Sequence, residues 1–480
     1  MASQIPPPPS ADRVSSLPDD VLHVILSFFP DTDERARTSL LSRRFRHLWA
    51  HHPSVRLGRS DKLIYLRCSD PDSTPVIGRY QISVDRCLAS LLSPVLQSLD
   101  LRLFSSRRSF RWIRRAADLS VRDLRLSAAP ELDLKVPISL FYCKSLVSLH
   151  LNCCLPPPAL PTFQGFLLLT RLKIMGTSIT DEALASLLSK CPSLQSLNLD
   201  ACHHLTSLHL SSPNLTKLKI FYCRGLELVR VDAPNLTGLQ FVGNVNNLFL
   251  HNARRLLNAN VCHFFYDGGT DFATPLDWAR PIISLSHISE RLRVNAWFFR
   301  FVLPEGLPTL FRNLRILHCC VDWVTPPMLN GLASLLGHCS NLEQLKIDLS
   351  CGVRKSVIYF RQLLLQLNVT QEEWGVFPDY MDKFERACED DREREVWDPS
   401  EVTRVPIDVS RSLKTVTVDA FLGTANEMKM LEYLLGKASV LEKLTIGDCM
   451  MRAKDEIQQL LAYIPRASSH VQICELNMMS

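Results

Sequence analysis

ASLLSKCPSLQSLNLD at residues 185–200 and ASLLGHCSNLEQLKID at residues 333–348 are nearly the same string, written twice, 148 positions apart. In the first copy Leu197 and Leu199 alternate with Asn198, so a strand here would turn both leucines inward and the asparagine outward. TDEALASLLSKC, which leads into it, predicts a helix capped by its own threonine. One helix–strand unit cannot bury its own leucines, so we expect such units to stack around one continuous core.

The pattern L-x-x-L-x-L, with conservative replacements, recurs along the chain with two spacings. Early copies begin 23 to 25 residues apart, whereas later ones follow at 10 or 11, so that two short steps make 21. Alternate members of the short series would then lie on opposite flanks of one turn. The copies begin at Leu96, Val121, Leu146, Leu169, Leu194, Leu205, Leu215, Leu226, Leu236, Leu314 and Leu342.

This spacing resembles that of leucine-rich repeats, whose period is about 20–29 residues. The resemblance implies an α/β solenoid with parallel strands on the concave face and helices and loops on the convex face. We assign the repeats to residues 80–368. The pattern weakens between residues 249 and 313, where we favour irregular repeats over an insertion that shapes a binding surface.

RVSSLPDDVLHVILSFFPDTDERARTSLLSRRFRHLW, residues 13–49, places three short helical patterns ahead of the repeats. Segments below roughly 40 residues usually need a staple or a partner to be stable. The first pattern, residues 18–29, has more apolar side chains than one helix face holds. One side can pack on the next two helices, while the other needs a separate cover. The apolar positions are Val21, Leu22, Val24, Ile25, Leu26, Phe28 and Phe29.

Residues 12–55 resemble an F-box. The matching features are Leu17-Pro18, Ile25-Leu26, Leu41-Ser42, Arg43-Arg44 and Trp49. The resemblance implies docking on the Skp adaptor of a cullin-RING ubiquitin ligase, with the uncovered apolar side buried in that interface. The alternative is a small helical cap on the domain that follows. The residues expected to dock on the adaptor are Leu17, Pro18, Val21, Ile25, Leu26, Leu41, Ser42 and Trp49.

Residues 405–480 resemble the FBD domain that follows the repeats in many plant F-box proteins. SLKTVTVDAFLGTANEMKMLEYLLGKASVLEKLTIGD, residues 412–448, ends with a stretch that aligns with the two strings above, Ala438 standing where they have Cys191 and Cys339. We therefore expect one more helix–strand turn that caps the open end of the core. The order F-box, repeats, FBD is similar to that of the plant F-box/leucine-rich-repeat family.

Two charged runs interrupt these patterns. Residues 371–401, within an insert assigned to 369–404, contain twelve acidic and four basic side chains, a net charge of −8. Such a block is usually a solvated loop or helix, and an acidic recognition segment is the alternative. Residues 107–115 are basic and interleaved with aromatics, and we expect a solvated face rather than a nucleic-acid or acidic-partner contact.

Composition argues against several other classes of protein. A net charge of +5 gives no bulk attraction to nucleic acid, and no apolar run approaches the length of a membrane helix, roughly 18 residues. The proline-rich start, residues 1–11, predicts a disordered tail rather than a signal peptide, which favours a cytoplasmic or nuclear protein. Sixteen cysteines without a C-x-x-C pair then predict reduced, buried thiols rather than disulfides or zinc ligands.

The sequence also lacks the common catalytic motifs G-x-S-x-G, H-E-x-x-H and G-x-x-x-x-G-K-[ST]. We expect no catalytic residue, cofactor or metal. One function implied by the resemblance is a substrate-recognition subunit of an SCF-type (Skp–cullin–F-box) E3 ubiquitin ligase, which binds a target protein on its repeats for ubiquitination and proteasomal degradation. The alternative is a repeat scaffold that binds partners without a ligase.

Overall fold

The computed structural model divides the protein into two compact units, residues 1–204 and 205–480. The expected N-terminal tail (1–11) and all of the acidic insert (369–404) except residues 396–398 lie outside the residues that the structure describes. Within the described part of the chain, no helix is both long and apolar enough to cross a membrane. The described residues are 14–29, 32–57, 70–129, 132–156, 165–263, 285–299, 311–349, 396–398, 411–447 and 459–476, apart from short gaps inside these ranges.

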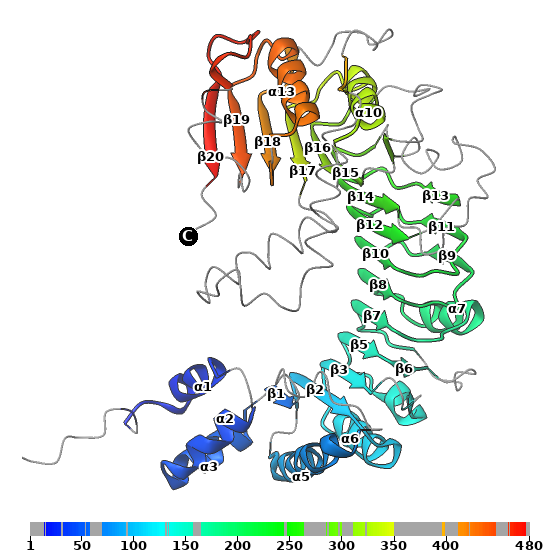
Figure 1. Ribbon diagram of the computed structural model, residues 1–480. Coiled ribbons are helices and arrows are strands. Elements are labelled where there is room, and N and C mark those ends of the chain that lie inside the picture. Colours follow the sequence, from blue (N-terminus) through cyan, green and yellow to red (C-terminus); the bar gives the residue numbers. More distant parts are fainter. Residues whose placement is uncertain are drawn as a thin grey trace, which may run out of the picture. The chain divides into compact units, whose positions relative to one another are not determined.

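The first unit begins with a group of short helices, residues 14–52, which we call the head (Figure 1). Pro18 is the N-cap of the first helix, and Asp19 and Asp20 lie in its first turn, where carboxylates stabilise the positive end of the helix dipole. The three-helix pattern expected from the sequence is confirmed. The elements are α1 (Asp19–Ser27), α2 (Thr32–Arg37), the 3-10 turn η1 (Thr38–Leu40) and α3 (Arg43–Ala50).

Parallel strands follow, and their leucines form rows in the core of the first unit. One such row contains five leucines that stand opposite one another on successive strands and are at most 2% exposed: Leu99, Leu124, Leu149, Leu172 and Leu197. The inward-facing leucines predicted from the alternation are therefore confirmed. The strands, in their order in the sheet, are β1 (Ser54–Leu57), β2 (Ser98–Leu103), β3 (Asp123–Ala128), β5 (Ser148–Asn152), β7 (Arg171–Met175) and β8 (Ser196–Asp200), and β4 (Leu134–Lys135) pairs separately with β6 (Cys154–Leu155).

The helix predicted ahead of residues 194–199 is α7 (Asp181–Ser189). Thr180 Oγ1 accepts the backbone N–H of Ala183 at 3.4 Å, which confirms the predicted cap. Leu184 and Leu187 are buried, so one face of α7 covers the leucine core. Two further helices and two 3-10 turns connect strands of this unit: η2 (Pro71–Ser73), α5 (Thr74–Ser90), α6 (Ser106–Asp118) and η4 (Ile138–Tyr142).

The basic run at residues 107–115 lies on α6 and is amphipathic. Trp112 is buried, and its indole Nε1–H donates to Asp85 of α5 at 2.7 Å. Arg108 and Arg111 form ion pairs with the same carboxylate at 3.0 and 2.8 Å. The run thus has a buried apolar side and a charged side joined to its neighbouring helix, in agreement with the solvated face that we expected.

The second unit contains two parallel sheets, and the closely spaced copies of the leucine pattern alternate between them. Strands β10, β12 and β14 pair in one sheet, while β9, β11 and β13 pair in the other. The prediction that alternate members lie on opposite flanks of a turn is confirmed. These strands are β9 (Ser207–Ser211), β10 (Lys217–Phe221), β11 (Leu228–Asp232), β12 (Gly238–Gly243), β13 (Asn247–His251) and β14 (Asn258–His263).

The C-terminal part of the chain continues the β10–β12–β14 sheet. Val416 and Val418 stand opposite Leu345 and Ile347, so the sheet passes from the last predicted repeat into the predicted FBD segment. Ala438 is buried, which agrees with a further helix–strand turn. The remaining elements are β15 (Arg291–Asn295), β16 (Ile316–Cys320), α10 (Pro326–Gly337), β17 (Gln344–Asp348), β18 (Thr415–Asp419), α13 (Ala425–Lys437), β19 (Lys443–Gly447) and β20 (Gln472–Leu476), and Figure 1 shows α10 and α13 on the same side of these strands.

One boundary differs from the sequence analysis, which began the repeats at residue 80. The ladder begins at β1, where Val55 and Leu57 stand opposite Leu99 and Leu101 in parallel register. The leucine pattern did not detect this strand because SVRL offers four residues and only one leucine. The first strand of the sheet, β1, therefore follows directly after the head.

A capping box fixes the start of α13. Glu427 is fully buried, and its Oε2 accepts the backbone N–H groups of Gly423 at 2.8 Å and Thr424 at 3.4 Å. Thr424 Oγ1 in turn accepts the N–H of Glu427 at 3.3 Å.

Replacing Glu427 with Ala leaves these two N–H groups without this acceptor, so we expect the free energy of unfolding to fall by about 2–4 kcal/mol. Urea denaturation of the full chain, with hydrogen exchange to localise the loss to α13, measures the effect. Glu432→Ala is the control, because Glu432 lies on the same helix in a partly exposed pair with Lys429. Equal midpoints for the two variants would contradict this account of the cap.

Candidate functional site

The head has a small core of its own between α1 and α3. Leu22 and Leu26 of α1 pack with Phe45 and Leu48 of α3, and all four are at most 4% exposed. With so few members, each contributes a large share of the apolar burial that holds the head together. The partly buried side chains that pack against this core are Leu17 and Phe29.

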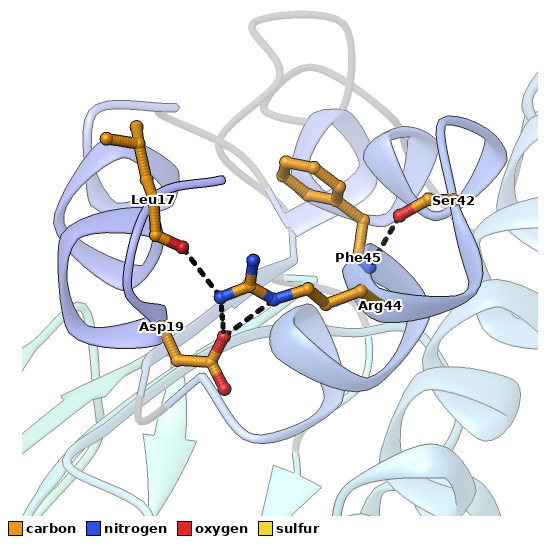
Figure 2. Close-up of polar contacts among 5 residues, drawn as sticks. All are labelled: Leu17, Asp19, Ser42, Arg44 and Phe45. Carbon is orange, nitrogen blue, oxygen red and sulfur yellow. Dashed lines mark hydrogen bonds and ion pairs between the residues drawn. The ribbon is translucent and has the colours of Figure 1, made fainter. Parts of the chain in front are cut away.

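Arg44 ties the start of α1 to α3. Its guanidinium donates to the backbone carbonyl of Leu17 at 2.7 Å and, through Nε, to Asp19 Oδ1 at 2.8 Å (Figure 2). At the start of α3, Ser42 Oγ accepts the backbone N–H of Phe45 at 3.3 Å. The Arg44–Asp19 pair is partly exposed and contributes about 1 kcal/mol or less. Its main effect is therefore to hold the Leu17–Asp19 segment against α3.

A second apolar stripe lies along α1, and it is exposed. Val21, Val24, Ile25 and Phe28 recur at the spacing of one helix face, and their exposed fractions run from 37% to 80%. Just before α3, Leu40 and Leu41 are 85% and 71% exposed. Large exposed apolar groups gathered on one small element mark an interaction surface. We call these six side chains the exposed apolar set: Val21, Val24, Ile25, Phe28, Leu40 and Leu41.

The structure exposes half of the docking residues that the sequence analysis named. Three members of the exposed apolar set were not on that list. In the sequence, Val24 and Phe28 are recognisable only as apolar residues in excess of one helix face. The residues around Leu40 form no regular apolar stripe, so the sequence did not predict that Leu40 is part of an exposed surface. The exposed residues from the list are Pro18, Val21, Ile25 and Leu41.

The remaining four listed residues are covered to different degrees. Leu26 is fully buried in the core of the head, so its side chain cannot contact a partner while the head keeps this fold. This corrects the expectation that both members of the Ile25-Leu26 pair face outward, since neighbouring residues on a helix point about 100° apart. The half-buried residues are Leu17, Ser42 and Trp49.

Buried polar contacts join the head to the first strand. The guanidinium of Arg35, a residue only 2% exposed, donates to His52 Nδ1 at 2.7 Å and to the carbonyl oxygen of Ser54 at 2.6 Å. Thr32 Oγ1 accepts the backbone N–H of Arg56 at 2.7 Å. These bonds attach α2 to β1 directly, so the head has a defined orientation on the strands next to it.

Acid is expected to weaken this junction. Burial, reinforced by the nearby Arg35 guanidinium, lowers the pKa of His52 to about 4, whereas an unfolded histidine titrates near pH 6.5. Between these values the unfolded chain binds a proton that the folded chain does not, so stability falls as the pH drops through this window. We expect His52 to account for a loss of about 1–2 kcal/mol in the free energy of unfolding, allowing for solvent screening.

His52→Asn keeps an acceptor for Arg35 and removes the titrating group. Urea denaturation at a series of pH values from 7 to 4 should therefore show a shallower slope for His52→Asn than for the parent. His51→Asn, at the exposed neighbouring residue, is the control. Parallel slopes for the parent and His52→Asn would refute the assignment.

The strands of the first unit carry a row of polar side chains between the leucines. Arg125, His150 and Lys173 are adjacent on three neighbouring strands. Burial, followed by the effects of Lys173 and Arg125, lowers the pKa of His150 to about 4. Burial also raises the pKa of Asp200 despite the nearby Lys173. This face is thus a partly covered polar surface that can bind a partner through hydrogen bonds and charge.

Several of the buried cysteines are structural thiols. Burial raises the pKa of the Cys191 and Cys154 thiols to about 12, so both stay protonated at neutral pH. The interpretation of Cys191 and Cys339 as small core residues agrees with their burial. Within the described residues, one group of side chains could hold a metal ion: His318, Cys320 and Asp348 in the second unit.

A helical head with an exposed apolar set, followed by stacked leucine-rich turns, defines a repeat protein with an N-terminal helical module. Comparison with protein-family models supports each part. The F-box domain model matches residues 14–57, and the FBD model matches residues 403–446. Between them, the model of the LRR repeats of FBD-associated F-box protein At5g56370 matches residues 110–259.

Curated proteins from Arabidopsis thaliana are similar to this chain over all or part of its length. F-box/FBD/LRR-repeat protein At1g13570 is 24% identical over 97% of this chain and 98% of its own length. F-box/LRR-repeat protein 25 is 30% identical over 42% of this chain and 72% of its own length. F-box/LRR-repeat protein At4g14103 is 34% identical over 40% of this chain, a stretch that spans half the length of that relative.

The chain belongs to the plant F-box/LRR-repeat family and carries the C-terminal FBD domain found in part of it. Family membership supports, in general terms, a role as a substrate adaptor in SCF-type ubiquitin ligase complexes. Proteins of this family are generally non-catalytic, and the F-box suggests an adaptor of the Skp type as a partner.

Proposed function

We propose that this protein is the substrate-recognition subunit of an SCF-type E3 ubiquitin ligase. The head docks on a Skp adaptor, the adaptor links the chain to a cullin, and the outward faces of the strands hold a target protein. The chain itself contributes no chemistry. It brings the target near the ubiquitin-carrying subunits, which raises the effective concentration of the reacting groups.

The observation that carries this proposal is the exposed apolar set on the head. A fully buried Val, Leu, Ile or Phe side chain contributes about 1.5–3 kcal/mol, whereas association costs about 4–15 kcal/mol in lost freedom of motion. Six such side chains can offset the lower part of that range. The partly exposed Pro18 region and the polar atoms around Ser42 would then lie at the rim of the interface, where contacts fix orientation more than affinity.

The target-binding part of the proposal is supported by the polar rows between the leucines. In the first unit this row contains Arg125, His150 and Lys173, and in the second it contains Arg293, His318 and Lys346. Side chains at these positions project away from the leucine core, so a target can contact them without disturbing the fold.

Co-expression of the intact chain with a Skp adaptor tests the proposal. We expect the two proteins to co-elute as a complex on size-exclusion chromatography and to recruit a cullin when it is added. Failure to associate at micromolar concentrations would overturn the ligase assignment and favour the scaffold alternative. Targets would then be sought by affinity capture under proteasome inhibition, comparing the intact chain with a variant that cannot dock.

A further inference from the structure

Strand pairing in the second unit brings together three side chains that can ligate a metal. His318 and Cys320 are two residues apart on β16, so they project from the same face of the sheet. Asp348 on β17 stands directly opposite Cys320 in the parallel register. The intervening chain includes α10, and only the register of the two strands makes these residues neighbours.

The distances suit a single small cation. His318 Nε2 lies 3.8 Å from Asp348 Oδ2 and 3.8 Å from Cys320 Sγ, and the three ligand atoms all lie within 4.8 Å of one another. Bond lengths of about 2.0–2.3 Å to zinc place tetrahedral ligand atoms roughly 3.4–3.6 Å apart. The two distances from His318 exceed this spacing by only a few tenths of an ångström. Cys320 and Asp348, whose ligand atoms lie within 4.8 Å, would have to move closer by up to about 1 Å to close the site around the ion.

Burial and charge favour the same assignment. Cys320 is 5% exposed, and the side chains of His318 and Asp348 are 23% and 18% exposed, so the group is shielded but still open on one side. A thiolate and a carboxylate together balance the charge of a divalent cation. Arg293 Nε donates to Cys320 Sγ at 2.8 Å, which stabilises the thiolate that a metal requires and orients it.

The nearby cation Lys346 is engaged elsewhere. It lies on β17, the same strand as Asp348, which pairs with β16 on one side and β18 on the other. Its Nζ pairs with Asp419 Oδ2 at 2.7 Å. Its charge is thus partly balanced by a carboxylate outside the three-residue group, which lowers its repulsion of a bound metal.

We propose that His318, Cys320 and Asp348 form a binding site for Zn²⁺ on the outward face of the second unit. One sulfur, one imidazole and one carboxylate are a ligand set that suits zinc, whereas magnesium and calcium prefer oxygen alone. Binding releases the proton of the Cys320 thiol to the solvent. The fourth tetrahedral position is open to water or to a side chain of a bound protein. This site is independent of adaptor docking by the head.

The test uses the full chain, stripped of metal by a chelator and kept reduced with a phosphine. Zn²⁺ is titrated in competition with a chromophoric chelator, and Co²⁺ is titrated separately while its absorption is recorded. We expect one tight equivalent of Zn²⁺ and a sulfur-to-cobalt charge-transfer band from a thiolate ligand. Cys320→Ser should abolish that band, and His318→Ala and Asp348→Asn should each weaken zinc binding by 10-fold or more.

Cys223→Ser is the matched control, because Cys223 is another buried thiol of the second unit and follows β10, which β12, β14 and β15 separate from β16 in the sheet. It should leave both the zinc stoichiometry and the cobalt band unchanged. Far-UV circular dichroism and thermal unfolding without metal verify that each variant is folded. In the parent, Zn²⁺ should also raise the unfolding temperature, and the three ligand variants should lose that rise. No zinc binding by the parent, or equal binding by all folded variants, would overturn the proposal.

Discussion

Truncating three members of the exposed apolar set is expected to abolish capture of a Skp adaptor. The variant Ile25→Ala/Phe28→Ala/Leu41→Ala removes side chains that are 37%, 80% and 71% exposed in the chain alone. Because these atoms would be buried only in the complex, we expect adaptor affinity to fall by roughly 100- to 1,000-fold, about 3–4 kcal/mol, measured by biolayer interferometry. The unfolding temperature should change little, since exposed truncations leave no cavity.

The matched control is Leu92→Ala/Ile138→Ala/Leu167→Ala, which removes three other exposed apolar side chains from the same unit. Their exposed fractions, 58%, 50% and 54%, are similar to those on the head, but they lie outside it. The control should bind the adaptor as the parent does. If both triple variants lose binding equally, the effect is not specific to the head, and if neither does, docking does not use the exposed apolar set.

Leu26→Ala is expected to act through folding instead. Its side chain belongs to the four-residue core of the head and is fully buried. Truncating a buried leucine typically costs about 2–5 kcal/mol, because apolar contacts are lost and a cavity remains. In so small a core we expect this loss to unfold the head locally, seen as rapid hydrogen exchange in α1 and α3 while the strands stay protected.

Val24→Ala provides a control on the same helix, two positions away, at a side chain that is 57% exposed. It should leave the exchange protection of α1 unchanged and weaken adaptor binding. Leu26→Ala should weaken binding only to the extent that it unfolds the head, so adaptor added in excess should restore protection of α1. If Leu26→Ala left protection intact and still removed binding, Leu26 would be a contact residue and its assignment to the core would be wrong.

The repeats could be predicted because their pattern is local. Alternating leucines set which side of each strand faces inward, and the spacing of 10 and 11 residues predicted the two sheets of the second unit. The cap at Thr180 could likewise be predicted, because Thr180 and Ala183, whose N–H it accepts, are only three positions apart. The first strand, β1, could not be predicted, because SVRL at residues 54–57 lacks the leucine pattern. Only its pairing with β2 identifies it as a strand of the sheet.

The exposed apolar set of the head could be predicted only in part. Both sides of α1 are apolar at helical spacing, so the sequence alone does not say which side α3 covers. The structure answers this through Phe45 and Leu48, which bury Leu22 and Leu26 and leave Ile25 exposed.

The neighbouring positions of His318, Cys320 and Asp348 could not be predicted for a related reason. Metal-ligand motifs in a sequence have short spacings, whereas Cys320 meets Asp348 through the register of two strands separated by a helix. Neighbours created by strand pairing are not visible in a local motif.

The unbroken pairing from β17 to β18 also bears on how genes of this kind can exchange parts. A recombination event between the two strands would join Leu345 and Ile347 of one parent to Val416 and Val418 of another, and these residues meet in adjacent rungs. An FBD segment can therefore replace another only where its first strand, β18, packs well beside the β17 that receives it. Exchanges that move β17 and the FBD segment together should preserve the packing between these strands. We therefore expect β17 and the FBD segment to be inherited together.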